Sequence, residues 1–429
     1  MARTHHVVII GGGFGGLYAA KAFGKLPVDV AVIDRRNYHL FQPLLYQVAT
    51  GGLSPGEIAS PIRHILRGFR NTRVLLGDVT DIDAGARQVV LADGERIPYD
   101  TVVVATGSAH HYFGHPEWAQ FAPGLKSIDD ATQMRSKILM AFEQAELEHD
   151  PEKRQAWLNF VIVGAGATGV ELAGAVGEIA NDTLKYDFRS INPREARIFL
   201  IEGADRVLPP YPPDLSKHAE RSLIRLSVRV RLNARVTNVN GDGVVVNSGG
   251  KDEVIPAKTV LWAAGVQASP LGELLHERVG APVDKAGRVM VLPDLSVPGH
   301  PEILVIGDLA SYMQDGKPVP GVAQVAMQMG EYTAKLVEAR LQNRKLPQFH
   351  YFDKGNMATI GRAAAVAEIG KLHIWGWLAW VTWLTIHIFY LIGFDNRLVV
   401  MVEWAYNYIT RNRGARLITG NPAPGKAEA

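Results

Sequence analysis

The chain has 429 residues, a length that suits two or three domains better than one core. Its formal net charge of +2 does not indicate nucleic-acid binding, which takes Lys and Arg concentrated on one face. Because it contains no cysteine, a disulfide, a cysteine-ligated metal centre and a thiol nucleophile are all excluded. Electron transfer through a redox-active cysteine pair is therefore excluded as well, and we expect no metal site.

Two segments repeat the pattern of a buried strand, a glycine-rich turn and a helix. They are VVIIGGGFGG at 7–16 and FVIVGAGATG at 160–169. Each is followed by a second apolar strand that ends in an acid, Asp34 in the first segment and Glu202 in the second. The chain enters the first strand without the charged and long apolar segments of a secretory signal, so we expect a cytoplasmic location.

Further apolar strands return to these units at 101–105, 260–263 and 303–306, the last running into Gly307-Asp308. The order predicts an α/β fold with two Rossmann-like domains, the second inserted in the first. We place the first domain at 1–115 and 285–346, and the second at 116–284. Residues 347–429 form a C-terminal region whose tail, from about 420, is predicted to be disordered.

The glycines have separate geometric roles in a G-x-G-x-x-G loop. Gly11 and Gly164 permit the tight turn, whereas Gly13 and Gly166 let the backbone approach a pyrophosphate. The third glycines, at 16 and 169, let the helix pack on the strand. The pyrophosphate then lies at a helix N-terminus, and the acid after the second strand accepts hydrogen bonds from a ribose. The sequence thus predicts two dinucleotide sites.

Two acids near the second loop bear on its ligand. A carboxylate at Glu202 would repel the 2′-phosphate of NADPH, so NADH is favoured. The interval from Gly169 to Glu202 is longer than usual, which indicates an extended helix or an insertion around 181–197. Glu171 lies in the first turn of the predicted helix. It either complements the helix dipole or acts as a functional carboxylate beside the nicotinamide and flavin, and the sequence leaves both open.

Several longer motifs resemble those of the type II NADH dehydrogenases, the non-proton-pumping NADH:quinone oxidoreductases. The resemblance covers nearly the whole chain, from Val7 to about Ile418. Beside the glycine loops it rests on RNYHLFQPLLYQVATGGL at 36–53, ATGS at 105–108, VGAGATGVELAG at 163–174, WAAGV at 262–266, VIGDLA at 305–310, AQVAMQMG at 323–330 and RGARLI at 413–418. The glycine loops are common to many enzymes, whereas 36–53, 323–330 and the C-terminal region are far more specific.

The resemblance implies that the first domain binds FAD and the second NADH. The residues that it assigns to FAD are Gly11, Gly13, Phe14, Gly15, Gly16, Asp34, Val79, Thr106, Gly107 and Asp308. Those that it assigns to NADH are Gly164, Gly166, Gly169, Glu171, Glu202 and Gly265. It also implies a quinone site at Gln324 and Gln328, with Lys354 as a weaker candidate.

The two glutamines are spaced as i and i+4, so they share one face of a helix and can address one ligand. The alternative is an ordinary polar helix face. It fits poorly, because the residues between and around the glutamines are mostly apolar. Glu171, Gln324 and Gln328 are therefore the candidate catalytic residues.

The C-terminal region contains a stretch without charge, Leu372 to Phe394, that is long enough to cross a bilayer. His373, His387 and tryptophans at every third position (377, 380 and 383) argue instead for a location at the membrane interface. The helix predicted over 397–413 has one apolar face and one polar face, with arginines after it for anionic headgroups. A single span and a dimer interface made of the same helices are the alternatives.

Together these features predict a membrane-associated flavoenzyme that oxidises NADH by hydride transfer and reduces a quinone without proton pumping. We expect it at the cytoplasmic face of the cell membrane, as a homodimer. A sulfide:quinone oxidoreductase or a disulfide reductase would need the missing cysteines. A flavoprotein that passes electrons to a protein acceptor, and a redox-sensitive binding flavoprotein of the apoptosis-inducing type, stay open as alternatives.

Overall fold

The computed structural model describes residues 4–419, except for the side chains of residues 394 and 395. The tail expected from about 420 lies outside the described residues. Packing divides the chain into two compact units. The first comprises the chain up to Leu40, Ala59–Ala109 and Val266–Lys354, and the second comprises Phe41–Ile58, His110–Gly265 and the chain from Gly355. The expected cofactor domains stay a prediction, because these units are defined by packing and not by a ligand.

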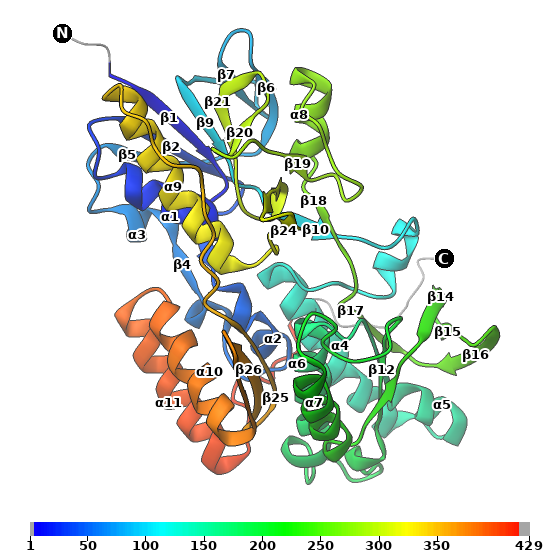
Figure 1. Ribbon diagram of the computed structural model, residues 1–429. Helices are drawn as coiled ribbons and strands as arrows, with labels where there is room; N and C mark the ends of the chain where they lie inside the picture. The colour runs from blue at the N-terminus through cyan, green and yellow to red at the C-terminus, as the bar shows by residue number, and fades with distance from the viewer. Residues whose placement is uncertain (1–3, 420–429) are drawn as a thin grey trace. The chain divides into compact units, whose positions relative to one another are not determined.

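The first unit is built on a six-stranded sheet in the order β20-β21-β9-β1-β2-β5. Its strands are β1 (His6–Ile10), β2 (Asp29–Asp34), β5 (Thr72–Leu76), β9 (Thr101–Val104), β20 (Ser296–Val297) and β21 (His300–Val305). All pairs are parallel except β20 with β21. Because helices flank the sheet (Figure 1), β9 is buried throughout and β1 nearly so, which explains their unbroken apolar runs.

The helices of the first unit are α1 (Phe14–Phe23), α3 (Ile62–Leu66), α8 (Leu271–Val279) and α9 (Ala323–Leu341). Its remaining strands are β3 (Tyr38–Leu40), β4 (Ala59–Pro61), β6 (Val79–Asp83), β7 (Gln88–Leu91), β8 (Arg96–Pro98), β19 (Val289–Met290), β22 (Ala310–Ser311), β23 (Met313–Gln314) and β24 (Lys317–Pro318). Helices α1 and α9 lie side by side (Figure 1). A Cβ on Gly330 would lie 2.3 Å from the Gly15 carbonyl oxygen, so the two backbones touch. This packing brings the glutamine-bearing helix against the first glycine loop.

The second unit contains a parallel sheet in the order β13-β12-β11-β17. Its strands are β11 (Asn159–Val163), β12 (Arg197–Ile201), β13 (Val228–Arg231) and β17 (Thr259–Trp262). A separate antiparallel sheet comprises β14 (Ala234–Asn240), β15 (Gly243–Ser248) and β16 (Lys251–Pro256). The helices are α2 (Leu45–Ala49), α4 (Ile128–Leu147), α5 (Pro151–Trp157), α6 (Ala167–Glu178) and α7 (Pro213–Arg225). Short strands β10 (Ser108–His110) and β18 (Val266–Ala268) lie where the chain leaves and re-enters the first unit.

An extended helix or an insertion was expected around 181–197. The structure has a π-helical turn, η4 (Ile179–Thr183), directly after α6. A short 3₁₀ turn at Pro193–Glu195 then leads into β12. The predicted strands and their acids are confirmed, since β2 ends at Asp34 and β12 runs directly into Glu202. The α/β class is confirmed as well.

The C-terminal residues of the second unit form a three-stranded sheet and two helices. These are β25 (Asn356–Gly361), β26 (Ala364–Ile369), β27 (Leu372–Trp375), α10 (Gly376–Tyr390) and α11 (Phe394–Thr410). The uncharged stretch from Leu372 is therefore divided between a strand, a helix and a turn. Among the described residues, no helix combines the length and the apolar character that crossing a membrane requires.

Candidate functional site

The first glycine loop has the backbone that pyrophosphate binding needs. Gly11 has a φ of +101°, and a Cβ on Gly16 would lie 1.7 Å from the Gly11 carbonyl oxygen. Gly13 has open space on its Cβ side and forms the N-cap of α1, with no side chain bonded to the helix end. No acid lies in the first turn, which begins with Phe14 and Gly15. The N-terminal N–H groups of this helix and its dipole thus fit an anionic group.

The second loop repeats this geometry in the second unit. Gly164 has a φ of +96°, and a Cβ on Gly169 would lie 1.8 Å from its carbonyl oxygen. Gly166 forms the N-cap of α6 and likewise has open space on its Cβ side. Gly265, in the loop after β17, also has a positive φ, of +68°. Two turns of equivalent backbone geometry are therefore present, one in each unit, and both suit an anionic group.

The acids after the second strands brace these loops in the same way. Asp34 accepts hydrogen bonds from the backbone N–H groups of Gly12 at 2.5 Å and Arg36 at 2.7 Å. Glu202 accepts them from Ala165 at 2.7 Å and Ala204 at 2.9 Å. A carboxylate oxygen has a second lone pair, so each acid retains capacity for a ribose hydroxyl.

The other residues assigned to FAD also lie in the first unit. The Asp308 carboxylate accepts a hydrogen bond of 3.0 Å from the Ser108 hydroxyl, which joins the turns after β9 and β21. Thr106 bonds Ser269 at 2.5 Å, and Gly107 has a φ of +67°. Val79 begins β6, in the small antiparallel sheet of this unit.

His39 is a residue that reasoning from the sequence missed. It is buried, its Nδ1 lies 2.9 Å from the Gly12 carbonyl oxygen, and its ring meets Phe14 edge-on at 5.1 Å. Its Nε2 has no protein partner among the described residues. Burial lowers the pKa of His39 to about 4, so the ring is neutral at physiological pH. Buried polar atoms are normally hydrogen-bonded, so His39 Nε2, beside the glycine loop, is suited to bonding a polar group of a ligand.

The structure brings the three candidate quinone residues together in the first unit. The Gln328 side chain pairs with the Phe352 backbone, donating to its carbonyl and accepting from its N–H, both at 2.9 Å. Gln324 accepts from the Lys354 backbone N–H at 3.2 Å. The shared helix face is thus real, and it holds the segment 352–354 against α9. The Lys354 side chain is exposed.

A cavity in the second unit surrounds Glu171. It contains about 830 Å³ of empty volume, part of it open to solvent. One wall is a face of α6 with Glu171, Ala175 and Glu178, spaced i, i+4 and i+7. The other walls come from α2 and the residues after it and from the C-terminal elements, with Tyr46, Gln47, Gly52, Thr359, Arg362, Trp380, Trp383, Trp404, Asn407, Tyr408 and Arg413 among the lining.

The cavity keeps its acid protonated at neutral pH. Burial of the Glu171 carboxyl raises its pKa to about 8, and a hydrogen bond from the Thr359 backbone offsets part of that rise. Tyr46 is buried, and its hydroxyl accepts a 2.9 Å hydrogen bond from Gln47. Burial, together with the charge of Glu171, raises the pKa of Tyr46 well above its usual range. A neutral carboxylic acid can donate a proton or a hydrogen bond. Compensation of the helix dipole, the alternative role for Glu171, does not require a protonated carboxyl.

The C-terminal helices correct two expectations. The tryptophans at every third position do not all face outward: Trp377 is 60% exposed, whereas Trp383 is buried, stacked on His387 and close to Trp404. The reason is that i+3 spacing advances around the helix and carries the stripe from surface to core.

The arginines expected to face anionic headgroups are each paired with an acid instead. Arg411 pairs with Asp182, Arg413 with Glu178 and Arg416 with Asp187. These ion pairs within the protein neutralise much of the charge of the three arginines.

Helix α11 turns its apolar face outward. Leu398, Met401, Val402 and Ile409 are exposed, whereas Glu403 and Asn407 are half-buried toward the second unit. Asn407 donates to the Gly52 carbonyl oxygen at 3.1 Å, and Trp404 donates to Gln47 at 2.7 Å. The helix is also attached by the buried Val400 and by Trp404, which packs on Trp383, so only part of its apolar surface, including the residues named above, is exposed.

Comparisons with known proteins agree with these features. Residues 5–330 match the family model for pyridine nucleotide-disulphide oxidoreductases. The chain is 47% identical over 428 residues to the type II NADH:quinone oxidoreductase Ndh of Mycobacterium tuberculosis, covering 98% of this chain and 92% of that one. It is 29% identical to the type II NADH:quinone oxidoreductase of Staphylococcus haemolyticus, over 83% of this chain and 87% of that one.

The fold also resembles that of two solved structures. NDH2 from Plasmodium falciparum in complex with NADH has a TM-score of 0.85 at 21% identity, covering 94% of this chain and 98% of that one. The sulfide:quinone oxidoreductase of Aquifex aeolicus has a TM-score of 0.71 at 18% identity, covering 92% of each chain. The family matches and the paired glycine loops lead to one conclusion: the chain belongs to the type II NADH:quinone oxidoreductases, within the pyridine nucleotide-disulphide oxidoreductase family.

Proposed function

We propose that this protein oxidises NADH by hydride transfer to a bound FAD and reduces a quinone to quinol, at a membrane surface and without proton pumping. The observation that carries the proposal is the pair of glycine loops, one in each unit, with matching geometry and matching carboxylate braces. The Mycobacterium tuberculosis relative, named a type II NADH:quinone oxidoreductase, supports the same reaction.

The FAD, when bound, supplies the hydride acceptance from NADH and the electron transfer to quinone. The chain's own residues bind and orient. In the first unit the N-terminus of α1, with Gly13, Phe14 and Gly15, holds the FAD pyrophosphate, and Asp34 holds a ribose. Asp308, which accepts a hydrogen bond from Ser108, would hold the ribityl chain, and the backbone at Val79 would hold the adenine.

In the second unit the N-terminus of α6 holds the NADH pyrophosphate, and Glu202 accepts from the adenosine ribose. Its negative charge discriminates against the 2′-phosphate of NADPH. Glu171, on the same helix, presents a neutral carboxyl to a cavity lined by tryptophans. We infer that it serves the reaction as a proton-holding group.

The quinone site is formed by Gln324 and Gln328 at the start of α9, with Lys354 beside them. Both glutamine side chains bond the backbone of 352–354 in the absence of ligand. A quinone carbonyl would compete for the amide N–H of Gln328, so ligand binding and the position of this segment are coupled.

The outward apolar faces of α10 and α11 support a peripheral, monotopic association with the bilayer. We propose that it takes place at the cytoplasmic face of the cell membrane. Trp377, Leu378 and Phe389 on α10 continue the exposed apolar surface of α11. A homodimer that uses the same surface is the alternative use of these residues, and the two can coexist.

The test is steady-state NADH oxidation by the purified, FAD-loaded protein, with and without a short-chain quinone, and with NADPH in parallel. We expect quinone to raise turnover strongly and NADPH to be a poor donor. If NADH reduces the flavin and quinone does not reoxidise it, the quinone assignment is wrong. A protein would then be the better candidate for the electron acceptor.

A further inference from the structure

The segment after α11 crosses the second unit as a strap, residues 411–419, held by side chains of distant elements. Arg411 pairs with Asp182 at 3.1 Å and Arg416 with Asp187 at 2.5 Å. The Ala415 N–H donates to the Gly51 carbonyl oxygen at 3.2 Å, and the Ser136 hydroxyl donates to the Thr419 carbonyl at 3.0 Å. The strap thus joins α4, the residues after α6 and the residues after α2.

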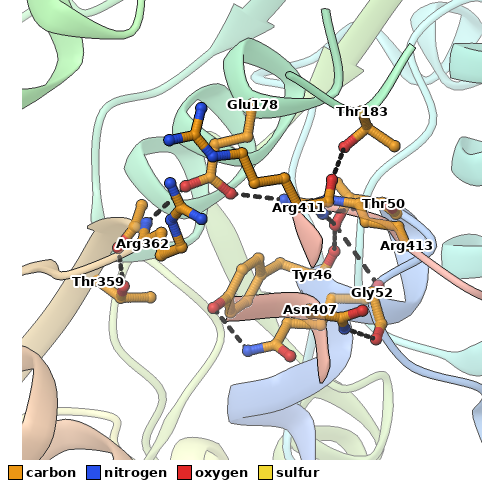
Figure 2. A network of polar contacts seen from close by, with 12 residues as sticks. Tyr46, Thr50, Gly52, Glu178, Thr183, Thr359, Arg362, Asn407, Arg411 and Arg413 are labelled. Carbon is orange, nitrogen blue, oxygen red and sulfur yellow. Dashed lines mark hydrogen bonds and ion pairs between the residues drawn. The ribbon is translucent and has the colours of Figure 1, made fainter. Parts of the chain in front are cut away.

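One contact of the strap differs from the rest because it is nearly buried. The Arg413 and Glu178 side chains are 12% and 18% exposed, and an Arg413 N–H donates to Glu178 Oε2 at 2.7 Å. The other arginine nitrogen donates to the Thr50 hydroxyl at 2.7 Å and its carbonyl at 3.1 Å. Glu178 Oε1 accepts from the Arg362 backbone N–H at 2.5 Å. Figure 2 shows how this network gathers α6, the β25–β26 turn and Thr50 around the guanidinium.

Glu178 and Glu171 stand on the same face of α6, two turns apart, and both line the cavity. That face is fixed at its far end by the pair with Arg413. It has little freedom elsewhere, because a Cβ on Gly174 would lie 1.6 Å from the Ile360 carbonyl oxygen. Thr50 ends the segment that carries Tyr46, and its hydroxyl donates to the Tyr46 carbonyl at 2.8 Å. Arg413 therefore connects the two walls that carry Glu171 and Tyr46.

We propose that Arg413 is a positioning residue for the quinone half of the reaction: by bonding Glu178 and Thr50 together, it holds Glu171 and Tyr46 in one cavity geometry. This inference rests on the proposed function. If Arg413 only fastens the C-terminus, any loosening of the strap would have the same effect as its loss. Arg416 provides that comparison, since its carboxylate partner Asp187 does not line the cavity of Glu171. Arg416 Nε also donates to the Arg413 carbonyl oxygen at 3.0 Å, so loss of Arg416 loosens the strap at Arg413 while the bonds of the Arg413 side chain remain.

Several ionisable groups face the cavity that Glu171 lines or lie near its carboxyl. Tyr46 comes from α2, Tyr211 from the segment before α7, and Glu178 and Asp182 from α6 and the turn after it. Arg362 comes from the β25–β26 turn, and Arg411 and Arg413 from the strap. The Glu171 pKa of about 8 depends on how far the packing around the cavity shields its carboxyl from water. It is therefore a reporter of the cavity's geometry as well as of its own charge.

The experiment compares Arg413→Gln, Arg413→Lys and Glu178→Gln with the control Arg416→Gln, all as FAD-loaded protein. The first readout is the infrared carboxylic C=O band of Glu171 as a function of pH, identified by its loss in Glu171→Gln. The second is turnover with a short-chain quinone and with ferricyanide, an acceptor that takes electrons without protons. The infrared titration needs no turnover, so it tests Arg413 even if quinone reduction fails in the parent protein.

We expect Arg413→Gln and Glu178→Gln to move the Glu171 midpoint in the same direction, downward, because both let water reach its carboxyl. Loss of the charges alone would instead move the midpoint up for Arg413→Gln and down for Glu178→Gln. Both variants should lower quinone turnover by ~10-fold or more, because a small misplacement suffices for that. Ferricyanide turnover should be retained. Arg413→Lys should recover part of both effects, since it restores the charge but not the paired hydrogen bonds. Arg416→Gln should match the parent. If Arg416→Gln instead moves both readouts as far as Arg413→Gln does, the positioning role is refuted. It is also refuted if Arg413→Gln and Glu178→Gln leave both readouts unchanged. Should Arg413→Gln fail to fold, Arg413→Lys and Glu178→Gln decide by the same criteria.

Discussion

At the scale of single residues, Asp34 and Glu202 illustrate how one carboxylate combines a structural and a binding role. Each holds a glycine loop through two backbone N–H groups. A carboxylate bonded in this way has little freedom to turn, so its charge stays beside the place where a ribose lies. The discrimination proposed for Glu202 would therefore come from a fixed charge and not from a mobile side chain.

The variant Glu202→Gln keeps an oxygen for the Ala165 N–H and loses the charge. We expect the ratio of kcat/KM for NADPH over NADH to rise by about tenfold, equivalent to roughly 1.4 kcal/mol, because repulsion of the 2′-phosphate is removed. Steady-state kinetics with both donors measure the ratio. Asp205→Asn, in the same loop and 73% exposed, is the matched control. An unchanged ratio in Glu202→Gln would show that another residue selects the donor.

Glu171 gives a pH-dependent contribution to stability whose sign follows from its raised pKa. Between the ordinary value of 4.5 and about 8, the folded protein holds a proton that the unfolded chain releases. This contribution is fully present below 4.5 and is lost as the pH rises through about 8. Above that pH the folded protein carries a buried charge.

We accordingly expect Glu171→Gln to gain thermal stability relative to the parent as the pH rises from about 5 to about 9, because glutamine cannot ionise. Thermal unfolding across this range, followed by circular dichroism, measures the difference between the two midpoints. Glu331→Gln, an exposed position on α9, serves as the control. A difference that stays constant with pH would mean that the surroundings of the half-buried Glu171 carboxyl do not raise its pKa.

At the scale of elements, the sequence predicts what is local and periodic. Strands β1 and β11 were predictable because both faces are buried and residues 7–10 and 160–163 are all apolar. The bond between Arg413 and Glu178 was not, because 235 positions separate the partners and neither stands in an unusual pattern. His39 could have been suspected only from its place in the specific segment 36–53.

The tryptophans of α10 show the limit of periodicity in another way. Spacing by three residues indicates a common side of the helix, but it does not say which part of that side is core. Trp383 turned out to fill the interior beside the cavity, whereas Trp377 is exposed. A helix that is apolar nearly all round gives no contrast from which to choose its buried face.

The outward face of α11 yields a prediction for membrane binding. Val402 and Ile409 are 61% and 79% exposed, so Val402→Glu and Ile409→Glu should leave the fold intact. Each should weaken co-sedimentation with lipid vesicles by ~10-fold, because one apolar side chain fewer is buried in the interface. Thr80→Glu, on an exposed edge of β6, is the control for added charge. If vesicle binding persists and sedimentation shows a dimer dissociating, the face is a subunit interface.

At the scale of the whole molecule, the chain places one glycine loop in each of two compact units, and the C-terminal helices belong to the second. The sequence predicted the two loops and their order, because each loop is a contiguous motif with a fixed geometry. It did not predict that residues 41–58 leave the first unit to pack with α6 and the C-terminal elements, since nothing in their composition marks that excursion. This crossing is what builds the cavity around Glu171.

The central claim is that NADH delivers electrons to the flavin and quinone removes them. The most direct test is an anaerobic experiment on the FAD-loaded protein, with NADH added first and a short-chain quinone second while flavin absorbance is recorded. We predict rapid bleaching by NADH and full return of the oxidised spectrum on addition of quinone. Bleaching without return, or return no faster than in buffer alone, would contradict the account.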